Sequence, residues 1–136
     1  MIESAEEFLR LRSSSAKSEY DRATYDEATI AVWLNVIRNY PELREWVVHN
    51  KTVPLEILEY LVENHPENNF FVASKRKLSS RLFDVLSRDG SFLVRERIAI
   101  NAKTPVQLLN ILSEDSVESV AQAAHYNLKN RKSKDA

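Results

Sequence analysis

The stretch IAINAKTPVQLLNIL at residues 98–112 decides the fold, because two earlier segments repeat its pattern. These segments are VVHNKTVPLEILEYL at 47–61 and VASKRKLSSRLFDVL at 72–86, so the three copies start 25 and 26 residues apart. Repetition at a fixed period of about 20 to 50 residues is typical of solenoids and other repeat arrays. The sequence therefore predicts a repeat protein.

Each copy contains an apolar pair followed, after two residues, by a third apolar side chain. This i, i+1, i+4 spacing marks one buried stripe of a helix. The triplets of the three copies are Ile57, Leu58 and Leu61; Leu82, Phe83 and Leu86; and Leu108, Leu109 and Leu112. Trp33, Leu34 and Ile37 give an earlier copy of the same triplet.

A second, shorter apolar cluster alternates with the triplets. Its members are Leu43, Val47 and Val48; Val72 and Ala73; Val94, Ile98 and Ala99; and Val120, Ala124 and His125. Each repeat is therefore predicted to be two helical segments joined by a turn, which bury their apolar faces only by stacking on neighbouring repeats. Thr104 followed by Pro105 predicts a helix start, with threonine as N-cap and proline at the first helical position.

The segment VRERIAINAKTPVQLLNILSEDSVESVAQAA at 94–124 resembles the variant leucine-rich repeat and, more loosely, HEAT-like α-solenoid repeats. The positions that follow the order of the variant leucine-rich repeat are Val94, Arg95, Ile98, Ala99, Asn101, Thr104, Pro105, Leu108, Leu109, Leu112 and Asp115. The preceding copy departs from that order, with Lys75 in place of asparagine and Leu78-Ser79 in place of threonine-proline. Some members of that family carry an iron–sulfur cluster on cysteines, which this chain lacks. The resemblance implies an architecture and says little about activity.

We therefore expect an all-α fold: a right-handed α-solenoid of about four two-helix repeats in a single domain of residues 1–136. Residues 1–27 are expected to form an N-terminal helical cap, residues 28–128 the repeats, and residues 129–136 a frayed tail. Ser4 and Glu7 form a capping box that predicts a helix over residues 4–12.

The composition excludes several classes of site. The chain has no cysteine, so disulfides and thiolate metal sites are excluded, and its one glycine, Gly90, removes support for phosphate-binding and dinucleotide-binding loops. The start MIESAEEFLRLR does not resemble a signal peptide, and no apolar segment is long enough to span a membrane. We expect a cytoplasmic protein without a cofactor or a membrane partner.

The charge is unevenly distributed. Residues 1–67 carry 7 basic and 13 acidic side chains, a net charge of −6, whereas residues 68–136 carry 12 and 7, a net charge of +5. Such a split bears on the choice of partner rather than on the fold.

Aligned repeats also place large side chains at one position just before the buried residues of the second helix. This position holds Trp46, Phe71, Arg97 and Ala123 in successive copies. Tryptophan and arginine are frequent interface anchors, although the two aromatic residues could equally fill gaps between repeats.

The turns between repeats carry a basic cluster. It consists of Lys75, Arg76, Lys77 and Lys103, with Arg81 and Arg88 nearby. These side chains could hold an acidic protein surface or a phosphate backbone, or form an ordinary solvated edge. Asn50, Asn101 and Asn127 recur at equivalent positions, and we expect them to close helices in the left-handed conformation rather than to bind a ligand.

These patterns favour a non-enzymatic protein-binding module. Its expected anchors are Trp46, Phe71 and Arg97, and the basic turns form an electrostatic rim around them. A narrower hypothesis is an inhibitor or an immunity-type partner. Nucleic-acid binding is the main alternative, and a DNA-base-processing enzyme using Asp84 or Asp89 is a weaker one. His49, His65 and His125 have no metal-ligand spacing, so no metal site is expected.

Overall fold

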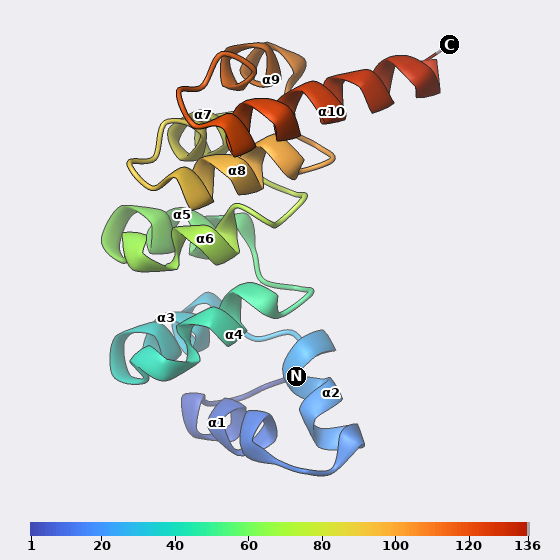
Figure 1. Ribbon diagram of the computed structural model, residues 1–136. Coiled ribbons are helices and arrows are strands. Elements are labelled where there is room, and N and C mark those ends of the chain that lie inside the picture. Colours follow the sequence, from blue (N-terminus) through green and yellow to red (C-terminus); the bar gives the residue numbers. More distant parts are fainter. Residues whose placement is uncertain (136) are drawn as a thin grey trace. The chain divides into compact units, whose positions relative to one another are not determined.

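The computed structural model describes residues 1–135, and the side chains of residues 1–132. Over this range the protein is all-helical, as predicted, with ten α-helices and no β-strand (Figure 1). The α-helices are α1 (Ala5–Ser13), α2 (Lys17–Tyr25), α3 (Ile30–Asn39), α4 (Arg44–His49), α5 (Leu55–Asn64), α6 (Asn69–Val72), α7 (Ser80–Ser87), α8 (Phe92–Ile100), α9 (Val106–Leu112) and α10 (Glu118–Asp135). Two short 3₁₀ helices, η1 (Pro41–Leu43) and η2 (Pro66–Asn68), precede α4 and α6.

The chain forms two compact units, unit 1 (Met1–Phe71) and unit 2 (Val72–Ala136), and the boundary falls inside α6. The charge split follows the same boundary, because residues 68–71 carry no charge. Unit 1 contains 7 basic and 13 acidic residues (−6), and unit 2 contains 12 and 7 (+5).

In unit 1 the helices alternate between two rows. The first helices α1, α3 and α5 contact one another in order, and the second helices α2 and α4 contact each other beside them. The core of this unit includes an edge-to-face contact between Phe8 and Trp33, whose ring centres lie 5.2 Å apart at 86°. Both side chains are fully buried. The predicted N-terminal cap is thus itself a helix pair, α1 and α2, that packs on the next pair.

Unit 2 is built in the same way. Helix α7 packs on α8 and α9 packs on α10, while α7 contacts α9 and α8 contacts α10 (Figure 1). First helices therefore stack on first helices and second helices on second helices.

The predicted apolar stripes form the core of these pairs. Ile57, Leu58 and Leu61 are buried in unit 1, as are Leu82, Phe83 and Leu86 in unit 2. The first and last triplets differ, because Leu34 and Leu108 are half-buried whereas the other two members of each triplet are buried. His125, which the alignment grouped with the buried Val120 and Ala124, is exposed.

The helix starts follow local chemistry. The hydroxyl of Ser4 accepts a hydrogen bond of 3.0 Å from the backbone N–H of Glu7, which confirms Ser4 as the N-cap of α1. The prediction that Thr104 caps α9 is wrong. Helix α9 begins at Val106 after Pro105, and the fully buried Thr104 hydroxyl instead donates 2.6 Å to the carbonyl of Ile98.

The three recurring asparagines have a structural role, but not the one expected. None of the non-glycine residues that the structure describes has a positive φ angle, and Asn50 and Asn101 end α4 and α8 with φ of −63° and −58°. Each of the three side-chain amides instead donates to two backbone carbonyls near the end of the preceding second helix. The acceptors are Ala23 and Asp26 for Asn50, Ala73 and Lys75 for Asn101, and Ala99 and Asn101 for Asn127, at 2.8 to 3.0 Å. We call these contacts the asparagine bridges.

Helix α10 continues beyond the repeat end expected at residue 128 and runs to Asp135, in the segment expected to fray. The guanidinium of Arg131 contributes to this extension, because it donates to the backbone carbonyls of Asn101, Ala102 and Thr104 in the connection between α8 and α9. The last residue of the expected tail, 136, lies outside the described residues.

A partly buried ion pair joins α8 to the turn that follows α9. The guanidinium of Arg95 binds both carboxylate oxygens of Asp115 at 2.8 and 3.3 Å, and it donates 2.8 Å to the carbonyl of Asp89. The hydrogen bond from Arg95 holds the pKa of Asp115 below its ordinary value, and the backbone N–H of Val117 adds to this shift against the opposing effect of burial.

We predict that Asn101→Ala lowers the free energy of unfolding by about 3 kcal/mol, because it removes two hydrogen bonds to carbonyls and one accepted from Lys103. Urea denaturation followed by circular dichroism measures this loss. Asn110→Ala on the exposed surface of α9 is the matched control, with an expected change below about 0.5 kcal/mol. Equal effects of the two substitutions would contradict a structural role for the bridge.

We also predict that Asp115→Asn costs about 2 kcal/mol at pH 7. Because folding lowers the pKa of Asp115, the stabilisation is complete above the ordinary value near 3.8 and is lost as the pH falls through the lower pKa of the folded state. The difference between wild type and variant in urea denaturation should therefore shrink below about pH 3.8. Asp84→Asn, which breaks an exposed pair with Arg88, should cost less than about 0.5 kcal/mol throughout.

Candidate functional site

The aligned repeats hold two half-buried or exposed positions, three residues apart, at or just after the second helices. In α4, α8 and α10 these two positions lie on one helical face. The first surface row is the predicted one, Trp46, Phe71, Arg97 and Ala123. The second surface row consists of His49, Ser74, Ile100 and Tyr126. The two rows line a recess in each unit.

In unit 1 the recess holds about 250 Å³ and lies beside Trp46. Residues from α1, α2, α4 and the turn after α4 surround this Trp46 recess: Arg12, Ala23, Thr24, Trp46, His49 and Lys51. The ring centres of Trp46 and His49 are 5.5 Å apart, and that of His49 lies 5.7 Å from that of Phe71. Trp46 and Phe71 are thus connected through His49, and both are half-buried.

Arg12 closes the Trp46 recess from α1. Its guanidinium carbon lies 3.5 Å from the centre of the Trp46 ring, a stacked cation–π contact. Its Nε is buried, and among the described residues it has no hydrogen-bond acceptor. A buried donor without an acceptor is costly, and the Nε of Arg12 is such a donor at the wall of the recess.

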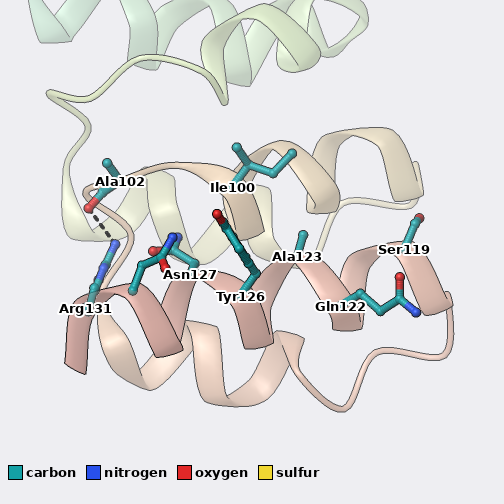
Figure 2. Close-up of a pocket in the computed structure, with 9 residues that line it drawn as sticks. Ile100, Ala102, Ser119, Gln122, Ala123, Tyr126, Asn127 and Arg131 are labelled. Atoms are coloured by element: carbon teal, nitrogen blue, oxygen red, sulfur yellow. Dashed lines mark hydrogen bonds between the residues drawn. The ribbon is translucent and has the colours of Figure 1, made fainter. Parts of the chain in front are cut away.

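Unit 2 has a larger recess, of about 570 Å³, along α10 beside the end of α8 (Figure 2). In this Tyr126 recess the side chain of Tyr126 extends from α10 toward Ile100 on α8, and Arg131 bonds to the backbone of Ala102 at one end. Tyr126 is 69% exposed and Ile100 52%, so two large side chains lie open to solvent on a second-helix face. Polar groups of Ser119, Gln122, Asn127 and Asn130 border them.

Arg97 lines a smaller hollow of about 190 Å³ that adjoins the Tyr126 recess through Ile100 and Ala102. Arg76 lines the same hollow, so the structure brings together one predicted anchor and one predicted basic turn residue. Arg97, Arg76, Lys77 and Lys103 are exposed, whereas Lys75 is half-buried.

Sequence reasoning found the first surface row and missed the second. The second row could have been found by adding three residues to each aligned position. The role of Arg12 could not have been found from the sequence. Arg12 belongs to no repeat, and its contact with Trp46 depends on how α1 packs against the helix pairs of unit 1.

The residues considered for catalysis or metal binding lie apart from both recesses, except His49. Asp84 pairs with Arg88 on the surface of α7, and the Asp89 carboxylate accepts 2.8 Å from the N–H of Ser91. His49 and His65 lie 3.6 and 3.5 Å from Glu45 and Glu67, respectively. Within the described residues, no three histidine or acidic side chains form a cluster that could hold a metal ion.

Comparison with known proteins gives no relative: no family model, curated protein or solved structure matches this chain. None of the described helices is both long and apolar enough to cross a membrane.

Proposed function

We propose that this chain is a protein-binding module of the α-solenoid type, with four two-helix repeats preceded by a helical cap. The period of 25 and 26 residues in the sequence supports the repeats. The order of helix contacts within each unit supports a stack, because first helices contact first helices and second helices contact second helices.

A single observation carries the proposed function: equivalent positions of the second helices line a recess in both units. Trp46 and His49 line the recess of unit 1, and Ala123 and Tyr126 occupy the same two positions in unit 2. Repeat proteins bind partners through side chains at equivalent positions of successive repeats. Aromatic and arginine side chains in such positions are typical interface anchors.

The same rows extend the binding surface beyond the recesses. Phe71 continues the aromatic contacts of Trp46, and Arg97 with Arg76 borders the Tyr126 recess. Lys77 and Lys103 add exposed positive charge in unit 2. An acidic segment of a partner is therefore favoured at the basic unit, and an inhibitor or immunity-type protein would use such a surface.

To test this proposal, peptides would be selected on the wild-type protein from a random library and their affinities measured by fluorescence polarisation. The variant Trp46→Ala with Tyr126→Ala should weaken binding by at least tenfold, because each truncation of an anchor costs about 1 to 2 kcal/mol. The control Leu55→Ala with Ile111→Ala removes exposed apolar side chains from first helices and should leave affinity within about twofold. Equal affinities for both double variants would refute the proposed surface.

Nucleic-acid binding is a second candidate, favoured by the net charge of +5 in unit 2 and by the exposed Arg76 and Lys77. It predicts DNA or RNA affinity that falls steeply with salt, as phosphate contacts require. In a low-salt gel-shift assay, the triple variant Lys75→Glu, Arg76→Glu, Lys77→Glu should then lose binding. The absence of any shift with the wild-type protein would eliminate this candidate.

A further inference from the structure

The Trp46 recess has an excess of hydrogen-bond donors. The carbonyl of Ala23 already accepts 2.8 Å from the Asn50 amide, and that of Thr24 accepts 2.7 Å from the N–H of Lys51. The Arg12 guanidinium and the Lys51 ammonium, by contrast, have no acceptor or counter-ion among the described residues. Two cationic side chains thus line one small cavity whose protein acceptors are in use.

The terminal nitrogens of Arg12 are the donors available to a ligand, because its Nε is buried. Stacking at 3.5 Å on Trp46 uses the face of the guanidinium, whereas its N–H groups point outward in the plane of the group. Carboxylates bind arginine in that plane, through two parallel hydrogen bonds. Lys51 supplies a second positive charge at the same recess.

The charge of unit 1 and the residues that line the recess narrow the choice of ligand class further. Unit 1 has a net charge of −6, so a ligand with two negative charges is repelled more strongly than one with a single charge. The rings of Trp46 and His49 offer apolar contact beside the cations. A singly charged carboxylate with an apolar neighbour satisfies both conditions.

We propose that the Trp46 recess binds a carboxylate carried by an apolar-flanked segment of a protein partner, with Arg12 and Lys51 as the ligating residues. This inference deepens the proposed function and rests on it for the nature of the ligand. The carboxylate can come from a chain terminus or from an acidic side chain, since both present the same planar group.

Peptide probes separate the two sources. The first pair is acetyl-Leu-Ala-Leu with a free carboxyl terminus and the same peptide with a terminal amide. The second pair is acetyl-Leu-Glu-Leu amide and acetyl-Leu-Gln-Leu amide, and inorganic phosphate is added at matched ionic strength. Binding is followed by NMR through the indole N–H signals of the two tryptophans. The signal that disappears in Trp46→Phe is that of Trp46, and the signal of the fully buried Trp33 serves as an internal reference.

At least one carboxylate peptide should shift the Trp46 signal in a saturable way, and its neutral match should not. Arg12→Gln and Lys51→Gln should each weaken this binding about tenfold, as expected for loss of a charged hydrogen bond. Lys51 is exposed, so its substitution tests the site even where Arg12→Gln impairs folding. Arg10→Gln on the same helix, whose side chain pairs with Glu19, makes the same change in net charge and should have no effect.

Equal binding of charged and neutral peptides would overturn the inference while leaving the proposed protein-binding surface intact. Tighter binding of phosphate than of either carboxylate would overturn it in favour of a phosphate site. A third outcome separates the two proposals. A carboxylate-specific shift of the Trp46 signal would support this site, while unchanged affinity of the selected library peptides for the Trp46→Ala, Tyr126→Ala variant would contradict the proposed function.

Discussion

The asparagine bridge is the interaction on which the arrangement of the second helices depends. A buried amide has two donor hydrogens and one acceptor oxygen, and Asn101 uses all three. Its two donated hydrogen bonds reach the residues after the preceding second helix, and its oxygen accepts from the N–H of Lys103 in its own turn. Because the two accepting carbonyls are fixed in the backbone, the amide sets the translation of one second helix along the next. An apolar contact alone would not fix that translation, since dispersion and burial are largely non-directional.

The register set by the bridges places the surface rows. In unit 1 the bridge of Asn50 to the end of α2 brings Ala23 and Thr24 against Trp46, which forms the wall of the recess. In unit 2 the bridge of Asn127 to the end of α8 brings Ile100 beside Tyr126. The same helix register thus produces both the buried asparagine bridge and the recess on the surface of the helix pair. The position equivalent to these asparagines holds Lys75 in the copy at the unit boundary, where an ammonium group can donate but cannot accept.

The sequence predicted the features that depend on periodicity within one helix. The triplets at Ile57 and Leu82 are buried because an i, i+1, i+4 pattern places three side chains on one face whatever the neighbouring repeat does. Prediction from sequence failed where a side chain hydrogen-bonds to a partner outside its own helix. Thr104 has the form of an N-cap, but a shift of one residue in the helix start turns its hydroxyl toward Ile98. Asn101 has the form of a helix-closing residue, but its partners lie 26 and 28 residues earlier. The stacking of Arg12 on Trp46 has no signal in sequence spacing.

The described turns all use backbone angles open to any L-amino acid, and even Gly90 has a negative φ and open space where a side chain would begin. Substitution in these turns therefore meets little steric resistance, in contrast to folds whose tight corners admit glycine alone. Over evolutionary time the connecting segments of such a chain are free to vary in residue type while the helix pairs keep their geometry. Changes of residue type at the turns therefore leave the interior of the helix pairs unaltered.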